Sequence, residues 1–357
     1  MRKRIVIFCP YPLGEAPSQR FRFEQYLDLL RADGYTVDQY PFLSAENWRD
    51  IYKAGNVMGK ISIMITAWLR RWKEIKEVKR ADYVFIHREM AQFGPPVFEW
   101  LIAKFYRKPF IYDFDDAIWL PNFSETNRVF HRVKWYGKVK QITKWANQVI
   151  VGNKYLSDFA SKYNNNVVII PTTIDLEHHH NLWSTVDNNK LVIGWTGTHT
   201  TMNYLDALLP ALERLEKEFD FEFRVISNKR PDFELKSLHY VPWTKEKEIQ
   251  DLAEINIGVM PLVEDQWSKG KCGFKALQYM SLGIPSVISP VGVNTEIIEN
   301  QVNGFLADTS EEYYTVLKRL LNDQDLRLQI GKSGHETIKE RYSVKANYIK
   351  YKRLFQE

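Results

Sequence analysis

The amino-acid sequence predicts an α/β protein of two Rossmann-like, doubly wound domains that face each other across a cleft. Three observations predict this class. Short β-branched segments alternate with longer amphipathic segments along most of the chain, as is typical of repeated βα units with parallel strands. The alternation restarts after a polar linker at residues 176–190. A length of 357 residues suits two domains.

The first half begins with the buried strand RIVIFCP and continues as a regular series of βα units. The helix at 18–35 has Ser18 as its cap and Gly34 as its stop. The predicted strands are 4–10, 36–42, 82–89, 109–116, 148–153 and 167–175. The predicted helices between them are 18–35, about 50–80, 95–108 and 128–147.

The second half repeats the pattern and then ends in a long aromatic, basic helix. The predicted strands are 191–197, 221–227, 238–243 and 255–262, with helices at 201–218 and 245–254. We therefore divide the chain into domains at 1–180 and 181–341, with a final helix at 342–357.

Composition and charge narrow the function classes. No apolar run reaches the ~20 residues of a membrane span, and the apolar start is too short for a signal peptide. Cys9 and Cys272 form neither a metal-like cluster nor a disulfide framework, which fits a reducing cytoplasm. The three histidines at 178–180 are interpreted as a polar loop. Residues 1–180 hold 27 Lys/Arg against 19 Asp/Glu, so the first half is basic and the second mildly acidic, which points to different partners.

Residues 269–298, KGKCGFKALQYMSLGIPSVISPVGVNTEII, form the most informative segment. A glycine followed by a helix start presents free backbone N–H groups to an anion. Lys271 and Lys275 are four residues apart and share one helical face. The segment therefore predicts a phosphate or diphosphate site, and the alternative is an ordinary βαβ unit with solvated lysines.

This segment resembles the C-terminal signature of family 4 glycosyltransferases, which have the GT-B fold. IGWTGTHTTMNYL, VPW, IGVMPL and VNGFLAD also occur in the family's order. The resemblance implies a retaining transferase with an acceptor-binding first domain, a donor-binding second domain and a last helix that packs back on the first. It also implies a nucleotide-diphosphate sugar as donor and no metal or other cofactor.

The resemblance assigns donor-binding roles to residues of the second domain. The sequence departs from the family's Glu-x7-Glu pair, because Gln278 replaces the second Glu and Gly270 falls where the first is expected. Glu264 or Asp265 is the candidate for the sugar contact, and Glu296 is the conventional carboxylate at a helix start. The donor-binding candidates are Gly197, Thr198, His199, Trp243, Glu264, Lys271, Lys275 and Gln278. Trp243 is equally well explained as a core aromatic.

The first domain offers candidates for acceptor binding and proton transfer. Asp113-Phe-Asp115-Asp116 ends a strand, and His87 ends the preceding one. Asp-x-Asp is also a metal signature of the GT-A fold, but lysines at the phosphate make a metal unnecessary. We name Asp115, Asp116 and His87 as catalytic candidates. Arg20 and Arg22 start a helix on different faces, so one is expected to point towards a phosphate, with Arg20 preferred.

Two basic aromatic segments predict a further partner. Residues 57–80 carry six Lys/Arg in their last eleven positions, and residues 128–144 contain six Lys/Arg and no acid. Such segments suit an anionic membrane surface, and no nucleic-acid motif accompanies them. The alternative is two helices packed on a sheet with a solvated basic face.

The sequence thus predicts a glycosyltransferase that serves a glycan or lipid-linked acceptor in cell-surface polysaccharide or glycoconjugate synthesis. The predicted location is the cytoplasm, with peripheral contact at the inner face of the cytoplasmic membrane. The alternatives are a non-catalytic nucleotide-sugar-binding protein of the same fold and a GT-B sugar epimerase or phosphorylase.

Overall fold

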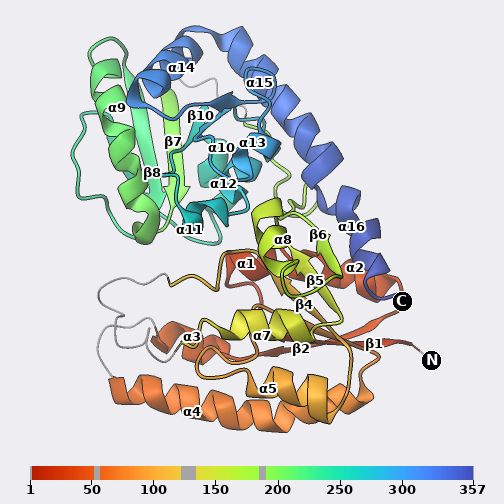
Figure 1. The fold of residues 1–357 in the computed structure, drawn as a ribbon. Coiled ribbons are helices and arrows are strands. Elements are labelled where there is room, and N and C mark those ends of the chain that lie inside the picture. Colours follow the sequence, from red (N-terminus) through yellow and green to blue (C-terminus); the bar gives the residue numbers. More distant parts are fainter. Residues whose placement is uncertain (1, 52–56, 122–133, 185–189, 357) are drawn as a thin grey trace. The chain divides into compact units, whose positions relative to one another are not determined.

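The computed structural model describes residues 2–51, 57–121, 134–184 and 190–356. The chain forms two compact units, Met1–Thr172 with Tyr348–Glu357 and Thr173–Asn347. The boundaries expected from the sequence were residues 180 and 342. Figure 1 shows the first unit in red to yellow-green and most of the second in green to blue.

The first unit contains a parallel sheet of six strands within its described residues. The strands are β1 (Arg4–Cys9), β2 (Thr36–Pro41), β3 (Tyr83–His87), β4 (Phe110–Phe114), β5 (Gln148–Val151) and β6 (Val167–Ile169). Their spatial order, β2-β1-β3-β4-β5-β6, reverses between β1 and β3. In doubly wound sheets, ligands bind beyond the carboxyl ends of the strands at such a reversal.

The second unit contains another parallel six-stranded sheet in its described part. Its strands are β7 (Leu191–Gly197), β8 (Phe221–Ser227), β9 (Leu238–Pro242), β10 (Ile257–Met260), β11 (Ser286–Ile288) and β12 (Phe305–Leu306). The order β12-β11-β10-β7-β8-β9 reverses between β7 and β10. The two parallel sheets confirm the predicted fold class.

Helices cover both faces of each sheet, and segments of 3-10 or π geometry are labelled η. Those of the first unit are α1 (Pro17–Arg20), η1 (Glu24–Tyr26), α2 (Leu27–Ala32), α3 (Ala45–Ile51), α4 (Val57–Glu74), η2 (Ile75–Arg80), α5 (Val97–Trp100), η3 (Leu101–Phe105), α7 (Lys138–Trp145) and α8 (Lys154–Ala160). Those that follow are η5 (His199–Ala207), α9 (Leu209–Leu215), α10 (Glu248–Ala253), α11 (Gln266–Lys269), α12 (Phe274–Ser281), α13 (Asn294–Ile297), α14 (Ser310–Asn322), α15 (Gln324–Thr337), η6 (Ile338–Tyr342) and α16 (Val344–Arg353). In the described residues, no helix is long and apolar enough to cross a membrane.

The single helix predicted at 18–35 is wrong in one respect, because the structure breaks it into α1, η1 and α2. Phe21 and Phe23 lie in the break, and both are buried. Residues two apart point to different sides of a regular helix. An irregular turn therefore lets both rings enter the core.

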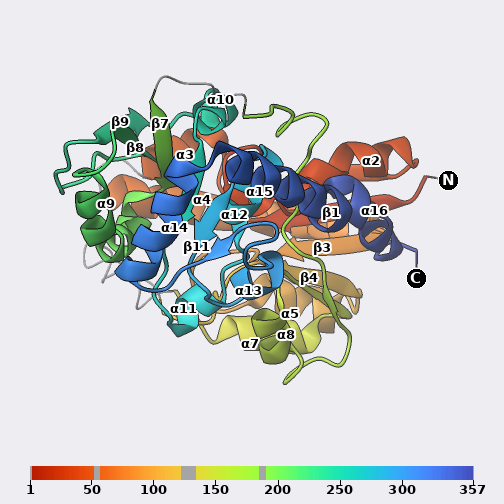
Figure 2. The same cartoon turned by 90° about the horizontal axis from the view of Figure 1, so that it is seen from above.

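The end of α16 belongs to the first unit. Tyr351 stacks on Tyr26 with ring centroids 4.2 Å apart, and Phe355 lies 5.6 Å from Tyr83. Figures 1 and 2 both show this end of α16 beside α2. The last turns thus complete the core on one face of the first sheet.

Candidate functional site

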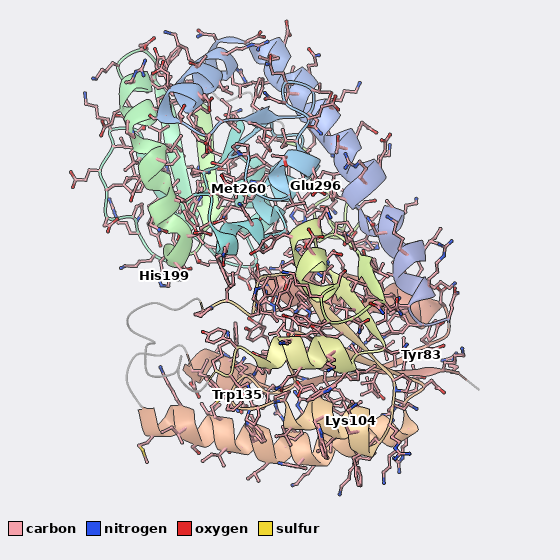
Figure 3. The ribbon with its side chains drawn as sticks, viewed as in Figure 1. Tyr83, Lys104, Trp135, His199, Met260 and Glu296 are labelled. Atoms are coloured by element: carbon pink, nitrogen blue, oxygen red, sulfur yellow. The ribbon has the colours of Figure 1, made fainter. Side chains whose placement is uncertain are left out.

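The candidate site of the second unit lies where its strand order reverses. Strand β7 ends at Gly197 and leads into the loop of Thr198 and His199, and β10 ends at Met260. His199 lies at the edge of the unit to which the β7 arrow points (Figures 1 and 3). Neighbouring parallel strands therefore deliver both loops to one edge of the sheet.

The loop that follows β10 is organised for close backbone approach. Asp265 caps α11 by accepting a hydrogen bond from the Ser268 N–H at 2.6 Å. Gly273 precedes α12 with φ +66°, a conformation that favours glycine. A Cβ on Gly292, in the next loop, would lie 2.9 Å from the Lys269 carbonyl oxygen. Two glycines thus hold the start of α12 against its neighbouring loops.

Lys275 lies in the first turn of α12 and is the strongest anion-binding candidate. Its Nζ lies 5.4 Å from the centre of the Trp195 ring. Within the described residues, no hydrogen bond or ion pair reaches its ammonium group. Burial, together with repulsion from Lys271, lowers the pKa of Lys275 to about 7. An anion at this position would relieve both effects.

Lys271 and the β7 loop lie close to the same place. Lys271 lies in the loop before α12, outside the helical face that its spacing from Lys275 predicted, and its charge contributes to the lowered pKa of Lys275. The Trp195 ring also packs against Gly197, where a Cβ would lie 2.5 Å from ring carbons. Trp195 therefore joins Lys275 to the β7 loop.

The β7 loop itself offers hydroxyl and backbone groups. The Oγ1 atoms of Thr198 and Thr200 are 2.8 Å apart. The His199 N–H donates to Asn228 at 2.9 Å, and the exposed His199 ring lies against the same amide. The loop is held in place without a lysine or arginine of its own.

Gln278 lies in a buried polar cluster that sequence reasoning missed. Its Nε2 donates to Glu248 at 3.4 Å and lies 3.5 Å from the Nε2 of His180. His179 and His180 are 3.0 Å apart through their Nδ1 atoms, and His179 lies 3.9 Å from Glu248. The polar-loop interpretation of residues 178–180 is therefore wrong for His180, which is buried. His180 is 98 residues from Gln278 in the chain, so no local pattern connects them.

Trp243 and Glu264 lie at the periphery. Trp243 is partly buried and packs against the apolar cluster that includes Val192 and Ile249. Exposed Glu264 forms a 2.7 Å ion pair with Lys269. Glu296 is exposed on α13 (Figure 3). Within the described residues, neither Glu264 nor Glu296 forms an ion pair with Lys275.

The first unit contains a buried cluster at the ends of β3 and β4. His87 Nδ1 lies 2.6 Å from Asp113, and the Arg22 guanidinium donates to the same carboxylate and to the Ile170 carbonyl. Burial opposes ionisation of Asp113, but Arg22 and His87 outweigh it and lower its pKa to about 2. The His87 Nε2 is buried with no hydrogen-bond partner in the described structure.

Asp115 and Asp116 are both held by Arg88. The Arg88 Nε donates to Asp115 at 2.8 Å, and its terminal nitrogen pairs with Asp116. Arg88 adopts a backbone φ of +56°, which is uncommon for a residue other than glycine. The Asp116 side chain is 29% exposed and that of Asp115 11%, so Asp116 is the more accessible carboxylate.

The first loop places Arg20 and Arg22 inside the unit. Both side chains are buried. Arg22 pairs with Asp113, whereas the Arg20 guanidinium lies 4.8 Å from the Phe21 ring. Gln19 fixes the loop by hydrogen bonds to both backbone groups of Tyr11, at 2.9 and 3.0 Å. Arg22 is thus committed to an ion pair inside the unit.

No group of three or more His, Cys, Asp or Glu within the described residues is arranged to hold a metal ion. The Asp-x-Asp segment binds Arg22, His87 and Arg88 instead. Its carboxylates act here as partners for cations of the protein itself.

A comparison with protein-family models finds a match in the second unit, which contains the candidate donor site. Residues 190–323 match a family model described as Glycosyl transferases group 1. The match spans the second sheet, both lysines and Gln278. A search of curated protein sequences returned no significant match.

Solved structures share the fold over nearly the whole chain. Sucrose-phosphate synthase from Thermosynechococcus elongatus is 12% identical with a TM-score of 0.69, covering 99% of this chain and 98% of that one. A glycosyltransferase from Rickettsia africae is 13% identical with a TM-score of 0.71 and the same coverage. Anabaena HepE, solved with UDP-glucose, is 15% identical with a TM-score of 0.64 and covers both chains fully. At these identities the likeness establishes the fold, which is GT-B as predicted.

Proposed function

We propose that this protein is a glycosyltransferase that moves a sugar from a nucleoside-diphosphate sugar to a hydroxyl of a glycan or lipid-linked acceptor. The observation that carries the proposal is Lys275, a half-buried lysine in the first turn of α12 whose Nζ lies 5.4 Å from the centre of the Trp195 ring. The family-model match over residues 190–323 and the UDP-glucose complex of the similarly folded HepE support it.

In this proposal the second unit holds the donor. Lys271 and Lys275 neutralise the diphosphate as point charges. The N–H groups of the first turn of α12 and the hydroxyls of the Thr198 loop add hydrogen bonds. Gln278 and Trp243 are assigned to the nucleoside, and Glu264 to the sugar. No metal or other cofactor is part of the proposal.

The first unit is assigned to the acceptor. Asp116 is the most exposed of the three catalytic candidates, and its carboxylate pairs with Arg88. It accepts a hydrogen bond from the acceptor hydroxyl and orients it. We assign Asp115 and His87 to positioning, because both are more deeply buried. The departing diphosphate takes the proton, and the sugar keeps its configuration, as the family resemblance implies.

The lysine assignment is tested by diphosphate affinity. A thermal-shift screen with UDP, GDP, dTDP and CMP first identifies the nucleotide that stabilises the protein. Lys271→Ala and Lys275→Ala should each weaken its binding about tenfold to a hundredfold in calorimetry, because each removes a charged contact. Lys269→Ala is the control, since Lys269 already pairs with Glu264. Unchanged nucleotide affinity in both variants would contradict the assignment of these lysines to the diphosphate.

A second candidate is a nucleotide-sugar-binding protein without transferase activity. Gln278 favours it, because an amide committed to Glu248 and His180 replaces the carboxylate of the family's pair. Sugar release from the matching nucleotide sugar discriminates the two. Release or transfer supports the enzyme, and tight nucleotide binding without either supports the binding protein.

The proposed location is the cytoplasm, at the inner face of the cytoplasmic membrane, where lipid-linked acceptors are accessible. No nucleic-acid partner is proposed.

A further inference from the structure

Helix α4 presents an apolar stripe to solvent. Its five members are each between 43 and 77% exposed: Met58, Ile61, Ile65, Leu69 and Trp72. At about 100° per residue, these positions fall within roughly 80° of the helix circumference. The stripe runs from Met58 to Trp72, which gives it a length of about 21 Å along the helix. Single exposed apolar residues are ordinary, but a continuous stripe of this kind is not.

The inward side of the same helix combines apolar and polar side chains, since Ala67 is buried there as well as Arg71. Arg71 is fully buried and donates to the carbonyl oxygens of Met90 at 3.0 Å and Tyr40 at 2.8 Å. Glu74 pairs with Arg71 at 2.8 Å and with Arg70 at 3.2 Å. The side chains of the stripe, in contrast, remain exposed and are not part of the core.

The neighbouring helix extends the apolar face. Trp72 contacts Phe98 of α5 with ring centroids 5.1 Å apart, which places α5 and η3 alongside α4 (Figure 1). Trp100 and Phe105 on that segment are 46 and 69% exposed. We call these two residues and the five of the stripe the α4 face. It is wider than one helix.

The charges around the α4 face are basic. Lys73, Lys76, Lys79 and Lys104 are exposed, and Figure 3 shows Lys104 on the segment beside α4. The two acids of α4 and η2 are already paired, Glu74 with the arginines above and Glu77 with Arg4 at 2.9 Å. An apolar stripe with tryptophan and a lysine border is the surface that enters the headgroup region of an anionic bilayer.

We propose that the α4 face docks this protein on an anionic lipid bilayer, with α4 lying in the plane of the interface. Lysine and arginine near the surface attract the anionic headgroups, and the apolar side chains enter the acyl boundary. A protein partner would have to supply both a matching apolar groove and many carboxylates. The inference goes beyond the proposed function, since it concerns a surface rather than the donor or acceptor site.

The test is vesicle flotation of the full chain. Vesicles of equal parts phosphatidylglycerol and phosphatidylcholine should carry the protein at low salt, and vesicles of phosphatidylcholine alone should carry much less. The double variant Ile65→Ser/Leu69→Ser should weaken binding at least about tenfold, because two apolar side chains no longer enter the bilayer. Leu328→Ser on α15, also in an exposed apolar position, is the matched control and should bind like wild type.

A second variant separates charge from apolar contact. Lys73→Gln/Lys76→Gln should weaken binding about tenfold or more at low salt, with a smaller difference at high salt. Both double variants change exposed side chains, and an unchanged melting temperature verifies their folding. Three results would overturn the proposal: no flotation with anionic vesicles, equal flotation of wild type and the Ile65/Leu69 variant, or a wild-type dimer that this variant converts to monomer.

Discussion

At the scale of single residues, Lys275 should make nucleotide binding at the donor site depend on pH. Its pKa of about 7 in the free protein means that much of it is neutral above that pH. A bound diphosphate should raise this pKa, so that binding at pH 8 takes up a proton. Calorimetry of UDP, or of whichever nucleotide binds, in buffers with different ionisation enthalpies measures that uptake. Lys275→Met should abolish it, and Lys269→Met, at an ion-paired lysine, should retain it. Equal uptake in wild type and Lys275→Met would contradict the assignment.

Asp113 should behave as a structural carboxylate. Asp113→Asn leaves the Arg22 guanidinium buried without its charged partner, at a cost of about 3–5 kcal/mol in the free energy of unfolding. The folded pKa of about 2 lies below the ordinary 3.8. The carboxylate's contribution is therefore complete above about pH 4 and is lost as pH falls towards 2. The gap between wild type and variant should narrow over that range.

Urea unfolding at pH 7 and at pH 3 measures this gap. Asp158→Asn is the control, because Asp158 forms an exposed pair with Lys154 and should change stability by less than about 1 kcal/mol. A pH-independent difference between wild type and Asp113→Asn would show that the charge is not the stabilising feature.

Residue-level prediction was limited even where a local pattern existed. The spacing of Lys271 and Lys275 predicted one shared helical face, but α12 begins at Phe274 and Lys271 lies in the preceding loop. The partners of Gln278 could not be predicted, because His180 and Glu248 reach it from distant parts of the chain. The Asp-x-Asp segment also gave no indication that Arg88 and Arg22 would occupy its carboxylates, since such pairing depends on strand register.

At the scale of elements, the start of α12 depends on a glycine. Gly273 has φ +66°, and a Cβ there would lie 2.3 Å from the Ile297 Cδ1. Gly273→Ala should cost more than the ~1–2 kcal/mol of a left-handed alanine, because Ile297 must also move. Gly34→Ala, at φ +91° with open space around it, isolates the backbone contribution. Urea unfolding should show the larger loss for Gly273→Ala, and only this variant should weaken nucleotide binding. Equal losses in the free energy of unfolding would show that the Ile297 side chain moves aside without measurable cost.

The sequence predicted which elements exist better than how they are oriented. Strands β7 and β8 match their predicted ranges, 191–197 and 221–227, because each is a continuous buried run. The helix at 18–35 is broken where two aromatic rings enter the core. Residues 57–80 were identified as basic and aromatic, but the side that faces the sheet could not be assigned from their sequence. The structure shows that both Ala67 and Arg71 are buried, so that side combines an apolar and a charged residue.

At the scale of the whole molecule, the fold of the first unit depends on residues near the end of the chain. Tyr351 is buried and stacks on Tyr26 at an interplanar angle of 7°. Tyr351→Ala should reduce the free energy of unfolding by about 3–5 kcal/mol, the range for a large buried aromatic side chain. Ile349→Ala, two residues earlier and 64% exposed, should change it by less than about 0.5 kcal/mol. Chemical unfolding of both variants checks this, and similar losses would place Tyr351 outside the core.

The fold class was predictable because two successive series of alternating strand and helix patterns occur along the chain. The two different strand orders were not, since alternation alone gives parallel strands without fixing their neighbours. The return of α16 to the first unit was expected only from the family resemblance, because a basic and aromatic composition does not indicate which domain a helix packs against.

That return also sets an order of events during synthesis. The stacking partner of Tyr26 emerges from the ribosome only after Thr173–Asn347 has been made. At about 5–20 residues per second, the nascent first unit waits on the order of 10–35 s with an aromatic surface uncovered. The core of the first unit is therefore completed only once the segment that carries Tyr351 has been translated.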